Sequence, residues 1–263
     1  MRGIIGVVHV PPMPGDPAYR EGGFEAALAF ADRDAARLAE GGCEAIIVEN
    51  FGSAPFPKGT PGQPTPPHQI AALTLVAHAA KAHGLPVGVN VLRNDVRSAL
   101  GIAAAVSADF VRVNVHVGAA VTDQGIIEGR AFETLRYRRE IGAERIQILA
   151  DVRVKHAAPL AAIPLEREVA DVVRRGMADA VIVTGSGTGE PVSRVELERV
   201  REAAGEATVI VGSGLDPERV EEFAPLADAA IVGTWLKAEG DVRRPVDVER
   251  VRRLCDLWRK ARG

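Results

Sequence analysis

Short runs of aliphatic, mostly β-branched residues recur along the chain, separated by stretches with helical spacing. Eight such runs occupy residues 4–8, 45–48, 87–91, 110–115, 146–149, 180–183, 208–211 and 229–232. Short apolar runs without strict alternation are typical of strands buried on both faces, as in a parallel sheet. Each run taken alone would also fit a piece of buried helix, so the regular series is the stronger signal.

Amphipathic stretches lie between these runs and predict helices. They cover residues 24–40, 70–83, 95–106, 130–141, 165–175, 195–204 and 248–260, with one more helix beginning at Asp216-Pro217. Several end at a glycine, the residue that most readily adopts the left-handed conformation found after a helix. Ser193 and Glu196 have the spacing of a capping box, and an aspartate followed by proline suits a helix start.

Eight strand–helix units in 263 residues, about 33 residues each, predict an α/β fold of the (β/α)8 TIM-barrel type. The alternative is a doubly wound open sheet, which the periodicity alone does not exclude. The first strand is not followed by the Gly-x-Gly-x-x-Gly turn of a dinucleotide-binding fold. No linker or change of composition divides the chain. We therefore expect one barrel domain over residues 1–263.

Composition narrows the class of protein. With 32 Lys and Arg against 35 Asp and Glu, the net charge of −3 argues against a nucleic-acid binder. No apolar run reaches the ~18 residues of a membrane span, so membrane insertion is not expected. Cys43 and Cys255 make neither a disulfide framework nor a zinc motif, which fits a cytoplasmic location. We expect a homo-oligomer with no cofactor and no metal.

Polar residues gather where the predicted strands end, and in a barrel the active site lies at the carboxyl ends of the strands. In chain order they are His9, Glu49, Asn50, Asn90, Arg93, Asn94, Asp95, Asn114, His116, Asp151, Lys155, His156 and Thr184. All four asparagines of the chain belong to this set. Asparagine also suits turns and caps, so part of this enrichment is expected without any function. We predict that the set holds the catalytic and substrate-binding residues.

Lys155 stands four residues after Asp151, at the end of the fifth strand. A lysine near a carboxylate is commonly a solvated ion pair. At this place in a barrel it would also suit a phosphate contact, a general acid or an imine-forming amine.

Glycine-rich turns follow the last two strands, as Gly212-Ser213-Gly214 and Gly233-Thr234. Barrels often bind phosphate at these two loops through backbone N–H groups, and glycine lets the backbone approach the anion closely. Tight barrel turns need glycine in any case. We predict that these five residues bind the phosphate of a phosphorylated small molecule.

Nine segments in order along the chain resemble the BtpA/SgcQ family. They are residues 5–15 (IGVVHVPPMPG), 49–52 (ENFG), 88–95 (GVNVLRND), 112–114 (RVN), 122–129 (TDQGIIEG), 151–156 (DVRVKH), 184–189 (TG through TG), 212–214 (GSG) and 233–234 (GT). Ser53 departs from the family pattern, which has an acidic residue there. The resemblance adds Asp123 and Gln124 to the predicted substrate-binding residues. It also implies a barrel like that of phosphoribosylanthranilate isomerase and a phosphorylated sugar or phosphoribosyl ligand, although the family's reaction is not established.

Strands one and five face each other across an eight-stranded barrel, so His9 and Asp151 are predicted as an acid/base pair, with Lys155 holding the substrate's negative charge. An isomerase or lyase needs such a pair. Photosynthetic members of the family are linked to photosystem I accumulation at the thylakoid membrane, so the alternative is a noncatalytic, membrane-associated assembly factor. A third possibility is metal-dependent hydrolysis through His9, Glu49 and Asp151.

The proline- and glycine-rich residues 50–67 are predicted to form a mobile cover over the barrel mouth.

Overall fold

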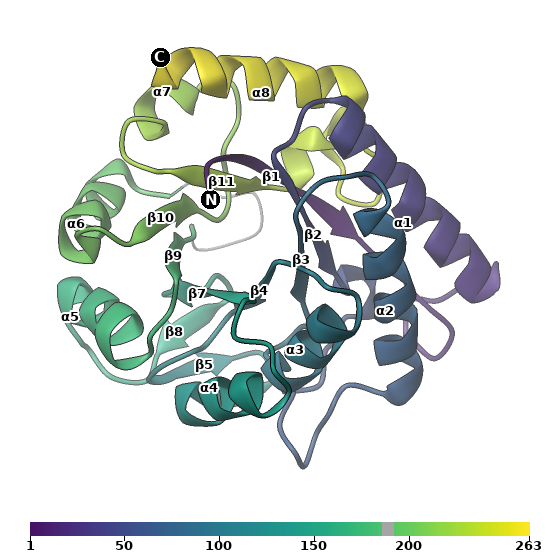
Figure 1. Ribbon diagram of the computed structural model, residues 1–263, viewed down its shortest axis with the longest axis horizontal. Coiled ribbons are helices and arrows are strands. Elements are labelled where there is room, and N and C mark those ends of the chain that lie inside the picture. The colour runs from purple at the N-terminus through teal and green to yellow at the C-terminus, as the bar shows by residue number, and fades with distance from the viewer. Residues whose placement is uncertain (186–191) are drawn as a thin grey trace.

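The computed structural model describes residues 1–185 and 192–263, and within them eight parallel strands close into a barrel (Figure 1). The strands are β1 (Gly3–His9), β2 (Ala45–Glu49), β3 (Val87–Asn90), β4 (Phe110–Val113), β7 (Gln147–Val152), β9 (Ala180–Val183), β10 (Thr208–Val211) and β11 (Ala229–Val232). They are hydrogen-bonded in chain order, and β11 closes the ring onto β1. The predicted TIM barrel is confirmed.

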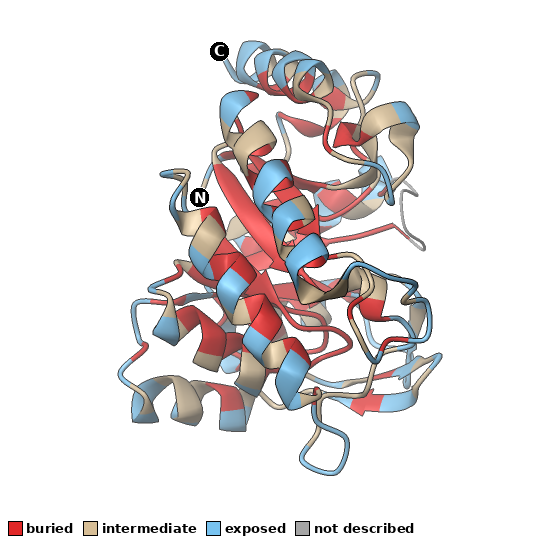
Figure 2. Ribbon diagram, turned by 90° about the vertical axis from the view of Figure 1, so that its right-hand side faces the viewer, coloured by how far each residue is buried: buried red, intermediate tan, exposed pale blue. Residues whose placement is uncertain are grey.

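Helices surround the barrel, with their buried faces toward the strands and their exposed faces outward (Figure 2). They are α1 (Gly23–Glu40), α2 (Pro67–Lys81), α3 (Val96–Ala105), α4 (Ala131–Glu140), α5 (Leu165–Ala170), α6 (Arg194–Ala204), α7 (Val220–Phe223) and α8 (Val248–Arg262). A π-helical turn, Asp171–Arg175, continues α5. Ser193 makes no side-chain cap on α6, so the predicted capping hydrogen bond is absent. No helix in the described ranges combines the length and the apolar character needed to cross a bilayer.

The strands bury one set of side chains outward and another inward, because successive residues of a strand point to opposite faces. On β1, Ile4 and Val8 belong to the core between strands and helices, whereas Ile5 and Val7 belong to a separate cluster inside the barrel. Phe110 fills the centre of that cluster against Gly88, where a Cβ would lie only 1.9 Å from its ring. The lower interior is thus packed, and inward positions near the carboxyl ends of the strands are left for polar residues.

A second sheet, which was not predicted from the sequence, lies beside the barrel mouth. It is antiparallel and consists of β5 (Ala119–Thr122), β6 (Gly125–Glu128) and β8 (Ala157–Pro159), in the order β6-β5-β8. It is built from the segments that follow β4 and β7. Its strands are only three or four residues long, and their apolar residues are divided between a small buried cluster and solvent. In strands this short, the alternation of apolar and polar residues covers too few positions to be recognised in the sequence.

Residues 50–67 form one wall of the barrel mouth. The Arg93 N–H donates to the Pro57 carbonyl at 3.0 Å, and the Thr65 N–H donates to the Asp95 carboxylate at 3.1 Å. The hydroxyl of Ser53, at the position where an acidic residue was expected, donates to Asp16 at 2.8 Å. These contacts attach the segment at several points along its length.

The mobility of this cover stays a prediction. We expect amide hydrogen exchange within residues 50–67 to slow on ligand addition, because closing the mouth would exclude water from the segment's backbone. Hydrogen-exchange mass spectrometry measures this, with α8 as the internal reference. Full protection of the segment without ligand would contradict a mobile cover.

Candidate functional site

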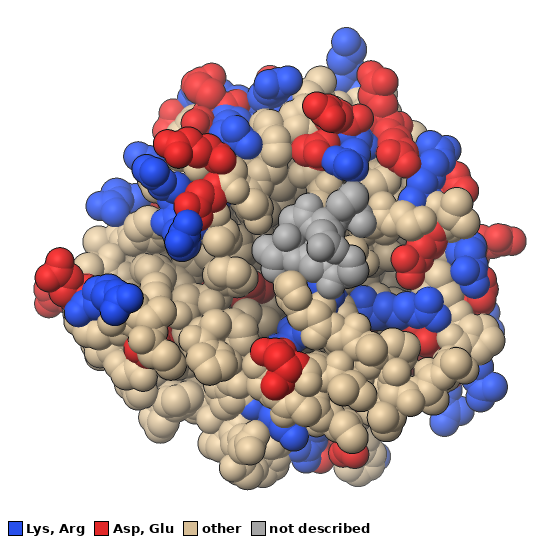
Figure 3. Space-filling view, turned by 180° about the vertical axis from the view of Figure 1, so that it is seen from behind, with Lys and Arg blue, Asp and Glu red and all other residues tan. Residues whose placement is uncertain are grey.

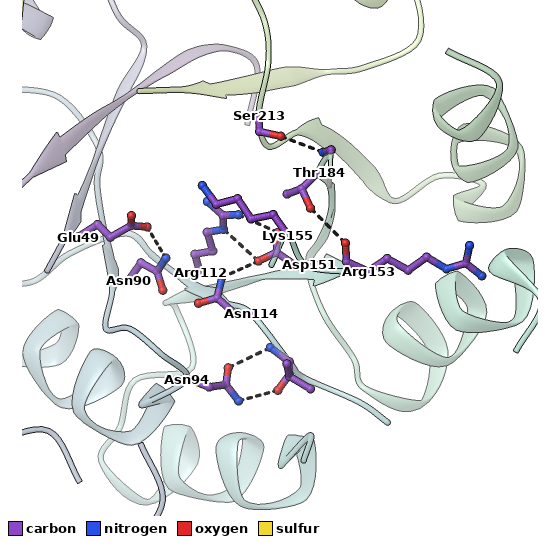
Figure 4. Close-up of polar contacts among 12 residues, drawn as sticks. Glu49, Asn90, Asn94, Arg112, Asn114, Asp151, Arg153, Lys155, Thr184 and Ser213 are labelled. Atoms are coloured by element: carbon purple, nitrogen blue, oxygen red, sulfur yellow. Dashed lines mark hydrogen bonds and ion pairs between the residues drawn. The ribbon is translucent and has the colours of Figure 1, made fainter. Parts of the chain in front are cut away.

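A ring of inward-facing polar side chains lines the carboxyl ends of the barrel strands (Figure 4). His9, Glu49 and Asn90 stand at the same level on β1, β2 and β3, since they are register partners across these strands. The Asn90 side-chain amide donates to Glu49 Oε2 at 2.6 Å. It is the one hydrogen bond that the described residues provide to this carboxylate. All three side chains are buried from bulk solvent.

On the other side of the ring, Arg112 of β4 and Asp151 of β7 form a buried ion pair. Arg112 donates from Nη2 to Oδ1 at 2.9 Å and from Nε to Oδ2 at 3.1 Å, and Asn114 donates to Oδ2 at 2.8 Å. The two paired side chains are 3% and 0% exposed. Burial alone would lower the pKa of Arg112, but the carboxylate of Asp151 outweighs it and raises that pKa. Both oxygens of Asp151 are therefore engaged.

His9 lies at the mouth with its ring edge against Phe51, the centroids being 4.9 Å apart. Burial lowers its pKa well below the usual value, and the positive charges of Lys237, Lys155 and Arg112 lower it further. The imidazole is accordingly neutral at neutral pH. Its Nδ1 is buried and has no hydrogen-bond partner among the described residues. A neutral imidazole can accept a proton at one nitrogen or donate from the other.

Lys155 extends across the middle of the ring from the β7 side (Figure 4). Burial lowers its pKa, and this effect exceeds the opposing attraction of Glu49. Its backbone carbonyl accepts a hydrogen bond from Arg93 Nη2 at 2.8 Å, which fixes the loop after β7 to the loop after β3.

Two cavities meet at these residues. The smaller one, about 200 Å³, is lined by His9 and by all five residues of the predicted phosphate loops, Gly212, Ser213, Gly214, Gly233 and Thr234. The larger one, about 370 Å³, is lined by Phe51, Arg93, Asn114, Asp123 and His156 among others. Glu49, Arg112 and Lys155 line both. A small molecule filling both cavities would touch these three charged side chains.

Glycine is needed at two inward positions of the ring. A Cβ on Gly233 would lie 2.5 Å from His9 Cε1, and a Cβ on Gly212 would lie 2.4 Å from Ile182 Cγ2. Both distances are far below van der Waals contact. Glycine at these positions lets the backbone pack closely against His9 and Ile182, and both glycines line the smaller cavity.

Three residues predicted to bind substrate instead hold the backbone. Asn50 accepts from the Leu92 N–H at 2.7 Å and donates to the Leu92 carbonyl at 3.3 Å. Asn94 does the same with Val115, at 2.9 Å for both bonds. Asp95 caps α3 by accepting from the Ser98 N–H at 3.0 Å. These side chains follow the turn and cap chemistry that was the alternative explanation for them.

Three further predicted residues lie outside the two mouth cavities. His116 bonds through Nε2 to the Gly176 carbonyl at 2.8 Å, and burial lowers its pKa. The Thr184 hydroxyl donates to the Arg153 carbonyl at 3.1 Å, and Gln124 contacts the neighbouring Asp123. The family-like segment 184–189 lies only in part within the described residues, since residues 186–191 are outside them.

Arg112 lines both mouth cavities but was not among the residues predicted for the site. It was counted within the apolar run 110–115, and the signal was its charge, since a single arginine in a buried strand requires a partner. Phe51 and Phe56, which line the larger cavity, were also missed.

Among the described residues, no group of three His, Cys, Asp or Glu side chains is placed to hold a metal ion. His9, Glu49 and Asp151, the ligands of the proposed hydrolytic site, accordingly do not converge in that way. Basic and acidic side chains are interspersed mainly along the upper and right parts of the face seen in Figure 3, and much of the rest of that face is uncharged, so the described residues form no basic stripe of the kind that binds nucleic acid there.

Similarity to solved structures agrees with the TIM-barrel fold. Phosphoribosyl anthranilate isomerase from Thermus thermophilus superimposes with a TM-score of 0.55 at 15% identity, over 99% of both chains. KGPDC from Streptococcus mutans superimposes with a TM-score of 0.60 at 10% identity, over 100% of both. Identities this low show a shared fold.

Sequence similarity is much closer. An uncharacterized protein of Thermococcus kodakarensis is 45% identical over 98% of this chain and 96% of its own. The photosystem I biogenesis protein BtpA of Synechocystis is 44% identical over 94% of this chain and 85% of its own. The profile of the BtpA family matches residues 1–260. The chain thus belongs to the BtpA family.

Proposed function

We propose that the protein is an enzyme that acts on a phosphorylated sugar or phosphoribosyl compound, as an isomerase or a lyase. The observation that carries this proposal is the junction of a glycine-lined cavity with a cluster of charged side chains and a neutral histidine. A phosphate in the smaller cavity would put the rest of the molecule against Glu49, Arg112 and Lys155. Fold neighbours that include a phosphoribosyl anthranilate isomerase support the same substrate class by analogy.

We assign the proton transfers to Glu49 and His9, which are neighbours on β2 and β1. Glu49 accepts one hydrogen bond among the described residues and lines both cavities, so its carboxylate can take a proton from carbon. The expected base, Asp151, has both oxygens occupied by Arg112 and Asn114. We therefore assign Asp151 to holding Arg112, whose charge would stabilise an oxyanion that develops on the substrate.

Phosphate binding is tested by thermal unfolding with inorganic phosphate, ribose 5-phosphate and glycerol 3-phosphate. A ligand present at a hundred times its Kd raises the free energy of unfolding by about 2.7 kcal/mol, a clear shift of Tm. We expect Gly233→Ala to abolish the shift, since its methyl group would enter the cavity beside His9.

The matched control is Gly101→Ala, a glycine within α3 where a Cβ would meet only Tyr137 Oη, at 3.5 Å, an ordinary contact distance. Its ligand-induced shift should equal that of the wild type. A shift that survives in Gly233→Ala, or no shift with any phosphorylated compound, would exclude the assigned phosphate site.

A second candidate function is assistance in the assembly of a membrane-bound complex. It is favoured by the 44% identity to a relative named for photosystem I biogenesis. Stabilisation by anionic lipid vesicles, with none by phosphorylated compounds, would favour this function over the enzyme.

A further inference from the structure

Two lysines of the barrel have opposite environments. Lys237 Nζ lies 2.5 Å from the carboxylate of Asp34, and both side chains are 0% exposed. Lys155, by contrast, has no carboxylate oxygen within 4.0 Å of its Nζ in the described part of the chain, and it is half-buried. Arg112 and Arg93 both act on it as like charges. An ammonium group that is partly withdrawn from water, beside like charges and without a paired carboxylate, is less stable than in water, whereas the neutral amine carries no such penalty.

The loop holds this amine at the place where a substrate would react. Lys155 lines both mouth cavities, and the hydrogen bond from Arg93 to its carbonyl fixes its backbone. The residues around it, Arg153 and His156, have φ angles of 55° and 57°. Left-handed backbone is unfavourable for non-glycine residues and concentrates at functional sites. Two residues of this loop thus hold an unfavourable backbone conformation, and the Lys155 side chain lies across the ring (Figure 4).

We propose that Lys155 Nζ forms an imine with the carbonyl carbon of the substrate. This proposal rests on the proposed function and deepens it, since it makes the substrate a phosphorylated aldehyde or ketone. The nitrogen lone pair forms the C–N bond, and both hydrogens of the neutral amine are transferred to the carbonyl oxygen, which leaves as water. No oxidation or reduction occurs. Once protonated, the imine withdraws electrons from the adjacent C–H or C–C bond, as an isomerase or a lyase requires.

Glu49 and His9 complete the reaction from the opposite side of the ring. They line the same small cavity as Lys155, so they can relay the protons that move from nitrogen to oxygen. The lowered pKa of Lys155 supports the step, because each unit of lowering gives about tenfold more neutral amine at neutral pH. Burial lowers the pKa of Lys237 as well, so geometry is what separates the two lysines: Lys237 is ion-paired with Asp34, is 0% exposed and lines neither mouth cavity.

Reductive trapping tests the proposal directly. The full-length protein is incubated with dihydroxyacetone phosphate, glyceraldehyde 3-phosphate, ribose 5-phosphate or pyruvate, then treated with sodium cyanoborohydride, and the modified lysines are identified by peptide mass spectrometry. The chain has five lysines, so each site can be quantified. We expect modification of Lys155 to exceed that of the exposed Lys260 by about tenfold or more. Glycerol 3-phosphate, which has the phosphate but no carbonyl, should suppress the modification by competition.

Lys155→Arg should lose the adduct, whereas Lys260→Arg should keep it. Site mapping on the wild type keeps the test valid even if Lys155→Arg does not fold. Modification spread evenly over the lysines, or none with any of the four compounds, overturns the imine.

Thermal unfolding measured in parallel with the same compounds distinguishes a wrong imine assignment from a wrong proposed function. Stabilisation by the phosphorylated compounds without a Lys155 adduct refutes the imine alone. A pyruvate adduct on Lys155 without stabilisation by any phosphorylated compound supports imine formation at Lys155 but refutes both the phosphate site and a phosphorylated substrate.

Discussion

Replacing Glu49 by Gln is expected to lower turnover by roughly 10²–10⁴-fold, the usual contribution of a positioned acid or base. The amide matches the carboxylate in size and can still contact Asn90, but it cannot accept a proton from carbon. Steady-state kinetics with a substrate identified by trapping or thermal stabilisation would measure the loss. We expect kcat to fall far more than KM rises, because the change acts on the transition state.

Asp151→Asn is the comparison that separates the two carboxylates. If Asp151 were the base, as was predicted from the sequence, this variant would lose turnover, but its free energy of unfolding would be close to that of the wild type. Asp151 is instead paired with the buried Arg112, so its removal leaves an unpaired charge. Breaking such a pair costs about 3–5 kcal/mol of stability. If the Glu49→Gln variant had normal turnover and the Asp151→Asn variant were stable but inactive, the role of the base would belong to Asp151.

Asp34→Asn is expected to lower the free energy of unfolding by about 3–5 kcal/mol, since the Lys237 ammonium group would lose its counterion in a fully buried place. Asp34 lies on α1, and its other oxygen accepts from the Val246 N–H at 2.8 Å. The carboxylate therefore joins α1 to the segments that precede α8. Urea unfolding at pH 7 would measure the effect.

The control is Asp34→Asn combined with Lys237→Met, which removes both charges. It should be less destabilised than the sum of the two single variants, since neither partner is left charged. A loss below about 1 kcal/mol in Asp34→Asn alone would mean that the pair is much weaker than a buried ion pair of this kind.

Periodicity predicted the barrel and the level of its polar ring, but not the contacts within the ring. His9, Glu49 and Asn90 followed from their places at strand ends, because parallel strands bring those ends together. The roles of Asn50 and Asn94 depend on loop geometry, since an amide facing a cavity and one bonded to backbone give the same sequence pattern. The pairing of Arg112 with Asp151 depends on which side chains meet across neighbouring strands, and no spacing along one strand contains that information.

The bonds of Asn50 to Leu92 and of Asn94 to Val115 have a consequence for protein engineering. Each amide side chain hydrogen-bonds to the backbone of the next loop along the chain. The loops after β2, β3 and β4 are therefore connected in series. TIM barrels are commonly diversified by exchanging one loop at a time. In this barrel, a single loop taken from a relative would not position its backbone to form these hydrogen bonds with the neighbouring loop. Grafts from relatives should therefore succeed only when adjacent loops are moved together.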